Sequence, residues 1–366
     1  MKWSWRIGQI GGVEIFVHST FFLLLAWVGV SHWNEDQSAA AVLDGLAFVL
    51  AIFGCIVLHE LGHAFAARRF GIRTRDITLL PIGGVARLER MPDQPLQELW
   101  VAVAGPLVNI VIAGSLYTGL TLSSTWTPIS ELQVGSGSFL NRLLLVNVML
   151  VVFNMIPAFP MDGGRVLRAI LALSMDYTRA TQIAASVGQG IALVLGFAGF
   201  FGSPMLLFIA FFIWLGATQE ASMVMLKTAL SGIPARRAML HDFHAVGPDD
   251  PLTVVIELIL GGSQTDFPVV ADGRVVGILT RADLLTAIAG HGSQTHVADV
   301  MQRQFETVDP SEMLELAFAR LQRCQCHTLP VVQAGQLIGL LTAENVGEFL
   351  MIQSALAGCR ESVPLP

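Results

Sequence analysis

The sequence predicts a polytopic α-helical membrane protein with about six transmembrane helices, followed by a soluble C-terminal α/β part. Composition supports the membrane domain, because 53% of residues are hydrophobic, only 13% are charged and the mean hydropathy is +0.63. Soluble globular chains contain about 25% charged residues. The apolar character ends near residue 230, and short alternating strand patterns with intervening helices follow. These observations divide the chain into a membrane domain and a soluble part.

Charge divides the chain at the same place. Residues 1–230 contain 13 Lys/Arg and 13 Asp/Glu, whereas residues 231–366 contain 8 and 15. The formal net charge of −7 therefore lies in the soluble part. An acidic surface argues against nucleic acid as a partner, because a phosphate backbone is bound by basic surfaces. A part of about 135 residues is also large enough to form its own core.

Six apolar segments in the membrane domain are candidates to cross the bilayer. They are residues 16–31, 46–66, 97–120, 139–157, 183–201 and 204–226. Lys and Arg gather before the first segment, between the second and third, between the fourth and fifth, and after the sixth; Arg142 is the exception on the other side. The positive-inside rule therefore predicts a multi-pass protein of the cytoplasmic membrane, with both termini and the soluble part in the cytoplasm. Residues 1–12 lack the apolar stretch of a cleavable signal peptide.

The second segment contains the sequence His59-Glu60-Leu61-Gly62-His63. On a helix, residues four apart lie on one face, so both imidazoles can point at one Zn²⁺ ion. Glu60 projects about 100° around the axis, where it can reach a water at the metal as a general base. The alternative is a pair of core histidines, since the pattern also arises by chance. Unpartnered polar groups cost several kcal/mol in a bilayer, so the membrane location favours a metal site.

A third ligand is expected at the end of the fourth segment, which the predicted topology brings to the same side of the membrane. Asp162 follows two prolines and precedes Gly163 and Gly164 in the stretch that begins at Asn154. Prolines end a regular helix and glycines allow unusual dihedral angles, so the carboxylate can turn back toward the core. Two histidines and one carboxylate, with an open fourth position, form a catalytic rather than a structural zinc pattern. An Asp-Gly-Gly sequence is also an ordinary turn.

The two motifs together resemble the site-2 protease family of intramembrane zinc metalloproteases. The resemblance covers roughly residues 5–225 and rests on HELGH and on Asn-x-x-Pro-x-x-Pro-x-Asp-Gly-Gly. It implies that His59, His63 and Asp162 bind zinc, that Glu60 is the general base, and that Asn154 lies near the substrate carbonyl. It also implies a transmembrane protein substrate within the lipid bilayer, cut near the cytoplasmic face.

Two other classes of protein remain as alternatives. A metal-binding transporter, or a scaffold that has lost catalysis, could retain the three ligands but has no evident need of Glu60. A soluble metalloprotease tethered by membrane anchors is disfavoured, because HExxH lies inside an apolar span.

Three further features of the membrane domain are less specific. Residues 77–88 have the form of a β-hairpin that could pair with an extended substrate strand, or could be a simple surface hairpin or re-entrant loop. The resemblance also implies a hairpin here. Asn109 is expected to serve helix packing through a hydrogen bond across the bundle rather than catalysis, and the role of Asn147 is left open between the two.

The soluble part contains an internal repeat. Residues 267–283 align with residues 329–345 at a constant offset of 62. The pattern resembles a tandem cystathionine-β-synthase (CBS) pair, with domains at 235–298 and 299–358. Such pairs commonly bind adenine nucleotides, so the resemblance implies ATP, ADP or AMP at Thr280, Asp283 and Thr342, and a regulatory role.

The second repeat departs from the nucleotide-binding pattern, because Asn345 stands where the first has Asp283. A purely structural pair, or one that forms a homodimer, is the alternative. Cys324, Cys326 and Cys359 are expected to lie in the reducing cytoplasm, where thiols stay free. With His327, Cys324 and Cys326 invite a metal-binding interpretation, but no second ligand pair lies nearby, which favours a structural role.

Overall fold

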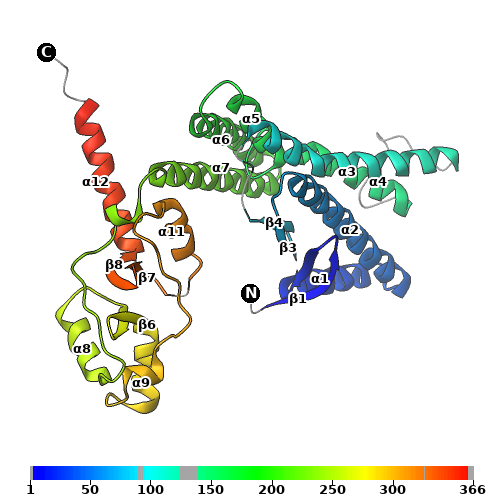
Figure 1. The fold of residues 1–366 in the computed structure, drawn as a ribbon. Helices are drawn as coiled ribbons and strands as arrows, with labels where there is room; N and C mark the ends of the chain where they lie inside the picture. Colours follow the sequence, from blue (N-terminus) through cyan, green and yellow to red (C-terminus); the bar gives the residue numbers. More distant parts are fainter. Residues whose placement is uncertain (1–2, 90–91, 93, 124–137, 325, 362–366) are drawn as a thin grey trace. The chain divides into compact units, whose positions relative to one another are not determined.

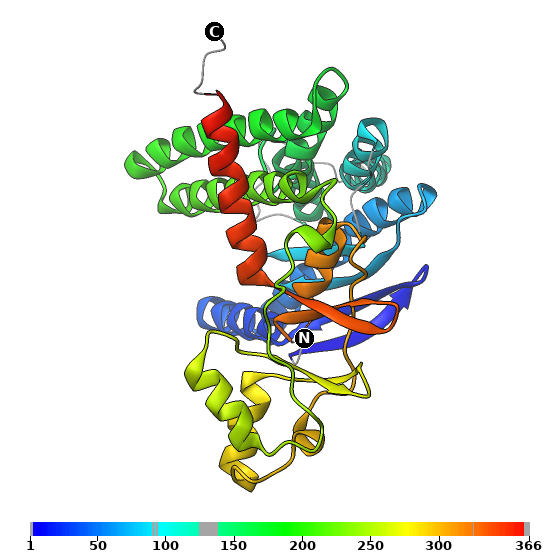
Figure 2. The same cartoon turned by 60° about the vertical axis from the view of Figure 1, so that its left-hand side comes forward.

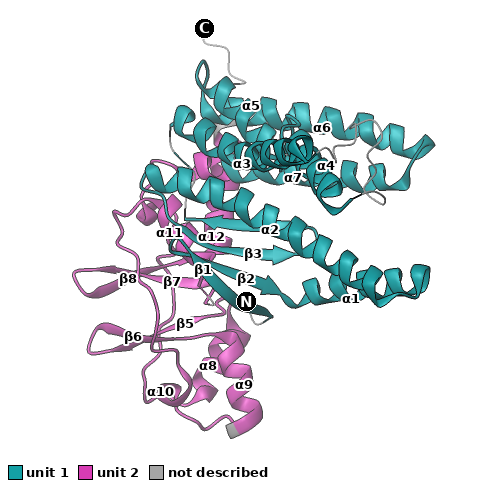
Figure 3. Ribbon diagram, turned by 90° about the vertical axis from the view of Figure 1, so that its right-hand side faces the viewer, with its two compact units in different colours: residues 1–224 teal, residues 225–366 magenta. Residues whose placement is uncertain are grey.

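The computed structural model describes residues 3–89, 92, 94–123, 138–324 and 326–361. The chain forms two compact units, Met1–Val224 and Met225–Pro366, which are coloured separately in Figure 3. Each unit has its own hydrophobic clusters. The two are described separately below.

The first unit contains a four-stranded sheet, made of β1 (Ser4–Ile10), β2 (Val13–His18), β3 (Thr74–Leu80) and β4 (Gly83–Leu88). The spatial order follows the chain order, and the β2–β3 pair is parallel while the other two pairs are antiparallel. A parallel pair needs a crossover, which the chain between β2 and β3 supplies with two helices. The expected hairpin at 77–88 therefore exists as β3 and β4, with β4 at one edge of the sheet.

The expected start of the first transmembrane segment at residue 16 is wrong. Residues 13–18 form β2 with alternating burial, in which Val13, Ile15 and Val17 face the core. The helix α1 begins only at Ser19. The alternation in Val-Glu-Ile-Phe-Val-His is the two-residue period of a half-buried strand, but it runs directly into apolar helix sequence that conceals it.

Seven helices of the first unit are described, and they cover the six expected segments. They are α1 (Ser19–Asp36), α2 (Ala39–Arg69), α3 (Pro95–Leu122), α4 (Phe139–Asn154), α5 (Asp162–Ala172), α6 (Tyr177–Phe201) and α7 (Pro204–Leu230), of which the last runs on into the second unit. Among the described helices, α2, α3, α6 and α7 are long and apolar enough to cross a membrane, whereas α4 is apolar but shorter. The protein is therefore a helical membrane protein in which four described helices have the length and hydropathy of a span, against the six segments expected from the sequence.

Helix α2 lies between the sheet and helix α3. Its side chains Phe53, Leu61 and Ala64 share a buried cluster with Val17 of β2 and Ile77 of β3. On the α3 side, a Cβ at Gly62 would lie 2.7 Å from the Ala104 carbonyl oxygen. The glycine inside the HELGH motif therefore allows the two helices to approach closely. Figures 1 and 2 show α2 and α3 among the long helices of this unit.

The second unit repeats one arrangement twice. The first copy contains α8 (Leu252–Gly261), β5 (Phe267–Ala271), β6 (Arg274–Leu279) and α9 (Arg281–His291), and the second contains α11 (Leu314–Leu321), β7 (Thr328–Gln333), β8 (Gln336–Thr342) and α12 (Ala343–Glu361), with the short α10 (Val297–Val300) between the copies. Parallel bridges Val246–Val269 and Val308–Val331 keep the offset of the sequence repeat. The expected α/β tandem pair is confirmed.

Two of the cysteines that were expected as free thiols are joined in the structure. A disulfide links Cys324 and Cys326, whose Cα atoms are 5.2 Å apart. That separation lies within the range that a disulfide can bridge, which sequence spacing alone did not reveal. The expectation of two reduced thiols is therefore wrong for this structure, and the metal-binding interpretation of Cys-x-Cys-His has no support from it.

Candidate functional site

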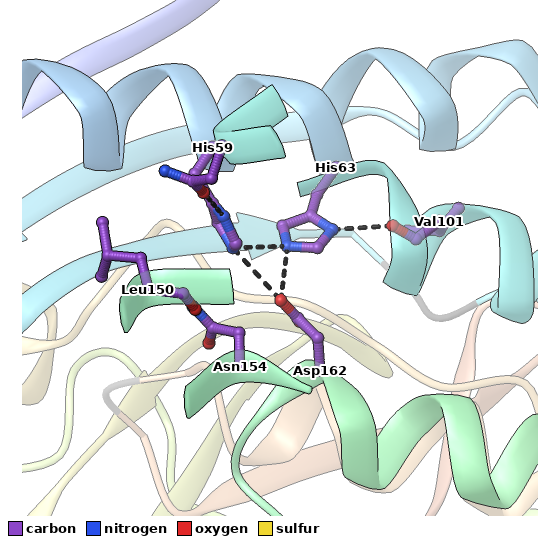
Figure 4. Close-up of polar contacts among 7 residues, drawn as sticks. His59, His63, Val101, Leu150, Asn154 and Asp162 are labelled. Atoms are coloured by element: carbon purple, nitrogen blue, oxygen red, sulfur yellow. Dashed lines mark hydrogen bonds and ion pairs between the residues drawn. The ribbon is translucent and has the colours of Figure 1, made fainter. Parts of the chain in front are cut away.

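Three buried side chains from two distant parts of the chain converge in the first unit. His59 and His63 lie one turn apart on α2, and Asp162 is the first residue of α5. The His59 Nε2, His63 Nε2 and Asp162 Oδ2 atoms are each 3.1 Å from the other two. Figure 4 shows them as a triangle. Among the described residues, this is the one group of three ligands that could hold a metal ion.

The dimensions of the triangle fit a zinc ion. Zinc bonds to nitrogen and oxygen are about 2.0–2.2 Å long and tetrahedral, which separates neighbouring ligand atoms by about 3.3–3.5 Å. The observed 3.1 Å separations are close to that value. Two histidines and one carboxylate also leave a fourth tetrahedral position open, as a catalytic site requires.

The hydrogen bonds of the two histidine Nδ1 atoms explain why a cation fits between the two Nε2 atoms and Asp162 Oδ2. His63 Nδ1 lies 2.7 Å from the Val101 carbonyl oxygen, and His59 Nδ1 lies 2.5 Å from Asn109 Oδ1. Both partners are oxygen acceptors, so each Nδ1 carries the ring proton and each neutral ring turns the lone pair of Nε2 inward. Two lone pairs and a carboxylate oxygen thus converge, an arrangement that a bound cation would stabilise.

The environment of Asp162 keeps its carboxylate negative. Burial raises the pKa of this carboxyl, but positive charge at the neighbouring Nε2 atoms of His59 and His63 outweighs burial and holds the pKa below its usual value. The local backbone is tight, because a Cβ at Gly163 would lie 2.3 Å from the Ile156 carbonyl oxygen. Gly164 is equally confined, 2.6 Å from the backbone nitrogen of Phe159. The two glycines therefore let α5 start close against the chain that follows α4. In this position Asp162, the first residue of α5, reaches the histidines.

Helix α3 forms the back wall of the triangle. A Cβ at Gly105 would lie 2.2 Å from His63 Nε2 and 2.7 Å from His59 Nε2. No real side chain tolerates such contacts. The ligand atoms can therefore occupy this space only because Gly105 has no side chain.

A cavity of about 460 Å³ opens beside the three candidate ligands. Its lining includes Glu60, Asn154, Arg165 and the edge strand β4. Glu60 lies against this strand, since a Cβ at Gly84 would be 3.1 Å from Glu60 Cγ. The Asn154 amide nitrogen donates to the Leu150 carbonyl oxygen of its own helix at 3.0 Å (Figure 4). The structure thus brings all five sequence-predicted residues of this site to one cavity.

Sequence reasoning missed the contribution of two asparagines. Asn109 on α3 contacts His59, and Asn147 on α4 contacts Asn109, whereas packing was favoured for Asn109 and the role of Asn147 was left open. The partners lie 50 and 38 residues apart in the sequence. No local pattern could therefore connect them with the HELGH motif.

The predicted nucleotide-binding residues form matching helix caps in the two repeats. Thr280 Oγ1 donates to Asp283 Oδ2 at 2.6 Å, and Thr342 Oγ1 donates to Asn345 Oδ1 at 2.6 Å. The Asp283 carboxylate also accepts from Gln302 Nε2 at 2.8 Å. A separate cavity of about 530 Å³ in this unit is lined by other residues, among them Arg236, His241, Asp309 and Ser311. Local capping therefore accounts for the Thr-x-x-Asp spacing without a ligand.

Comparisons with known proteins agree with this arrangement. The profile of peptidase family M50 matches residues 47–133 and 127–195, and that of the CBS domain matches 235–290 and 297–351. A zinc metalloprotease of Methanocaldococcus jannaschii is 31% identical over 94% of this chain and 96% of its own length. A protein of Synechocystis sp. named as a zinc metalloprotease is 30% identical over 96% of each chain.

A solved site-2 protease from Methanocaldococcus jannaschii is 36% identical, with 60% of this chain and 95% of that chain covered at a TM-score of 0.44. The sequence relatives span nearly the whole of both chains, including the soluble repeats. The chain therefore belongs to peptidase family M50, as a zinc metalloprotease of the site-2 protease type with a tandem CBS pair.

Proposed function

We propose that this protein is an intramembrane endopeptidase that cuts transmembrane or membrane-associated protein substrates near the cytoplasmic face. The observation that carries the proposal is the convergence of His59 and His63, with Glu60 beside them, on a helix long and apolar enough to cross a membrane, with Asp162 at the start of the short helix α5. In a soluble metalloprotease, the metal ligands would not be expected on an apolar helix of membrane-spanning length.

In the proposed mechanism, His59, His63 and Asp162 hold the zinc. When bound, zinc would supply a Lewis acid that polarises the scissile carbonyl and lowers the pKa of water. Glu60 accepts the proton of the attacking water and passes it to the leaving amine, because its carboxylate faces the same cavity as the ligands. Asn154 rotates away from the Leu150 carbonyl and donates its amide hydrogen to the developing oxyanion.

A substrate helix must unwind before attack, because its carbonyls are bonded within the helix. The strand β4 supports a way to hold the unwound segment. It is an edge strand of the sheet and lines the cavity through Gly83, Gly84 and Val85. An extended substrate can add to such an edge by main-chain hydrogen bonds, which presents its peptide bond to Glu60.

The cytoplasmic orientation is proposed from the distribution of basic residues. Arg142 is the exception to this distribution, and it forms an ion pair with Asp44. The excess of basic residues on one side of the membrane supports an assignment in which both termini and the CBS pair lie in the cytoplasm.

We further propose that the CBS pair regulates proteolysis by binding adenine nucleotide. Thr280 and Asp283 would contact the nucleotide in the first repeat, and Thr342 would make a weaker contact in the second. Asp283 supports this proposal, because a carboxylate can accept hydrogen bonds from two ribose hydroxyls. We also propose that the pair forms a homodimer. Met351, Ile352 and Leu356 on α12 are exposed apolar residues of the kind that such an interface buries.

The experiment that tests the protease function compares wild type with Glu60→Gln. Purified wild-type protein should contain one zinc per chain and should cleave at least one member of a panel of transmembrane substrates in liposomes. The Glu60→Gln variant should keep its zinc but lose proteolysis, because an amide cannot accept the proton of the attacking water. Zinc without cleavage in wild type would favour a metal-binding scaffold, and turnover in Glu60→Gln near that of wild type would remove Glu60 from the mechanism.

A further inference from the structure

Two fully buried asparagines stand between the helices that form the candidate zinc site. Asn109 on α3 and Asn147 on α4 are both 0% exposed. A buried amide that lacks hydrogen bonds costs about 1–3 kcal/mol, so the partners of each amide indicate what it does. These partners form one continuous series that ends at His59.

The series has a fixed direction. Asn147 Nδ2 donates to the Leu143 carbonyl oxygen at 2.9 Å, and a carbonyl can only accept. Asn147 Oδ1 is therefore turned toward α3, where it accepts from Asn109 Nδ2 at 2.8 Å. That bond turns Asn109 Oδ1 toward His59 Nδ1, 2.5 Å away. An amide has one accepting and one donating end, so each bond sets the direction of the next.

The second hydrogen of the Asn147 amide also has a partner. Its Nδ2 lies 3.4 Å from the Sγ atom of Cys55, which precedes His59 by one turn on α2. A reversed Asn147 would place its oxygen against the Leu143 carbonyl oxygen, which cannot donate. The Leu143 contact therefore disfavours the reversed orientation, whereas the Cys55 thiol could serve either one.

The two candidate ligand histidines are held in different ways. His63 Nδ1 donates directly to the Val101 backbone carbonyl, which cannot reverse. His59 donates to a side-chain amide, which could reverse and present an N–H to the ring instead. That reversal would move the ring proton to Nε2 and block the atom that faces the metal position. His59 therefore depends on a second group that keeps Asn109 in one orientation.

We propose that Asn109 and Asn147 form a positioning pair that fixes the tautomer and ring orientation of His59 as a zinc ligand. The proposal rests on the proposed zinc site and goes beyond it, because neither residue touches the metal position. Groups behind a ligating histidine typically change metal affinity 10–100-fold when removed. Asn109 holds the ring, and Asn147 holds Asn109.

The test measures zinc affinity by chelator competition and records the visible spectrum of the Co²⁺-substituted protein. Asn109→Leu should weaken zinc binding about 10–100-fold. Asn109→Asp should keep zinc and a near-normal cobalt spectrum, because either carboxylate oxygen can accept from His59. Asn147→Leu should weaken zinc binding in the natural background, where the Asn109 amide becomes free to reverse.

The decisive comparison is Asn147→Leu in the Asn109→Asp background. A carboxylate has no donating end and cannot be reversed, so loss of Asn147 should no longer reduce zinc affinity. This comparison also serves if Asn109→Leu does not fold. An equal loss of zinc affinity in both backgrounds would overturn the proposal, as would an Asn109→Leu variant with unchanged zinc affinity and cobalt spectrum.

Asn141→Leu is the matched control. Asn141 lies in the first turn of the same helix α4 and is 3% exposed, so its loss removes a comparable buried amide. It should change thermal stability without changing zinc affinity. If the wild-type protein binds no zinc, the proposed function is refuted. If wild type and all variants bind zinc equally well, only the positioning role of Asn109 and Asn147 is refuted.

Discussion

At the scale of single residues, Asp162 and Glu60 are two carboxyl side chains of one cavity that serve different purposes. Asp162 Oδ2 is 3.1 Å from both imidazoles, whereas Glu60 lines the open side against β4. We therefore expect Asp162→Ala to lower zinc content well below one ion per chain, and not turnover alone. Metal analysis after dialysis against a weak chelator checks this expectation. Stoichiometric zinc at ordinary affinity would mean that another residue completes the site.

Gly105 tests whether the space behind the ligand atoms matters. In Gly105→Ala the new methyl group would meet both Nε2 atoms, so the rings or helix α3 must shift. We expect a loss of zinc affinity of at least about tenfold, comparable with other changes around a ligating histidine. Chelator competition measures it.

Gly114→Ala provides the control for Gly105→Ala on the same helix. A Cβ at Gly114 meets no atom within 4 Å. We expect this variant to keep its zinc affinity and to gain up to about 1 kcal/mol of helix stability. Equal effects of the two substitutions would show that the close contact at Gly105 is unimportant.

At the scale of elements, the site depends on how α5 is fixed against its neighbours. Arg168 on α5 is fully buried, donates to Glu98 of α3 at 2.8 Å through Nε, and also bonds Glu220 of α7. Its guanidinium lies 4.9 Å from the Phe159 ring centre and 5.1 Å from that of Tyr177. One side chain thus joins three helices, one of which begins with a candidate ligand.

We expect Arg168→Met to destabilise the membrane domain by about 3–5 kcal/mol, because it leaves the buried Glu98 carboxylate without its partner. Thermal unfolding in detergent measures the change. Arg168→Lys should be intermediate, since a lysine keeps the charge but not the two-pronged contact. The exposed Arg179 provides a control, and Arg179→Met should stay within about 0.5 kcal/mol of wild type. A similar stability for both methionine variants would exclude this role for Arg168.

The elements also show which features the sequence could reveal. Long apolar runs and the repeat offset predicted the helices of the first unit and the α/β pair, because burial and period act locally. The strands β1 and β2 were missed, since β2 runs directly into the apolar helix α1. The pairing of Asn109 with His59 depends on how α2 and α3 pack, which no local pattern encodes.

At the scale of the whole molecule, the second unit is a doubled structure whose halves differ at one of the proposed nucleotide-binding positions. Both hairpins turn through two residues with positive φ, Asp272-Gly273 and Ala334-Gly335, as a type I′ turn requires. Both following helices are capped by a threonine. Asp283 in the first half and Asn345 in the second are the chemical difference, so one half alone offers a carboxylate at this position.

This difference supplies a clean test of nucleotide regulation. Asp283→Asn should keep the cap of α9, because Asn345 already accepts from Thr342 at 2.6 Å in the equivalent position. It removes the charge that would bind two ribose hydroxyls. We therefore expect adenine nucleotide to change the cleavage rate of wild type, and Asp283→Asn to weaken both nucleotide binding and that response with zinc content unchanged.

The measurement combines calorimetry of ATP, ADP and AMP binding to the full chain with cleavage rates at saturating nucleotide. A ligand can alter the rate only by binding one arrangement of the protein better than another, so binding and response should weaken together. Arg236→Gln separates the second cavity from the Asp283 position, because Arg236 lines that cavity and could contact phosphate there. Nucleotide binding lost in Arg236→Gln but kept in Asp283→Asn would move the site to the second cavity. Absence of any binding, with equal cleavage rates throughout, would leave the CBS pair as a dimerisation or substrate-docking module.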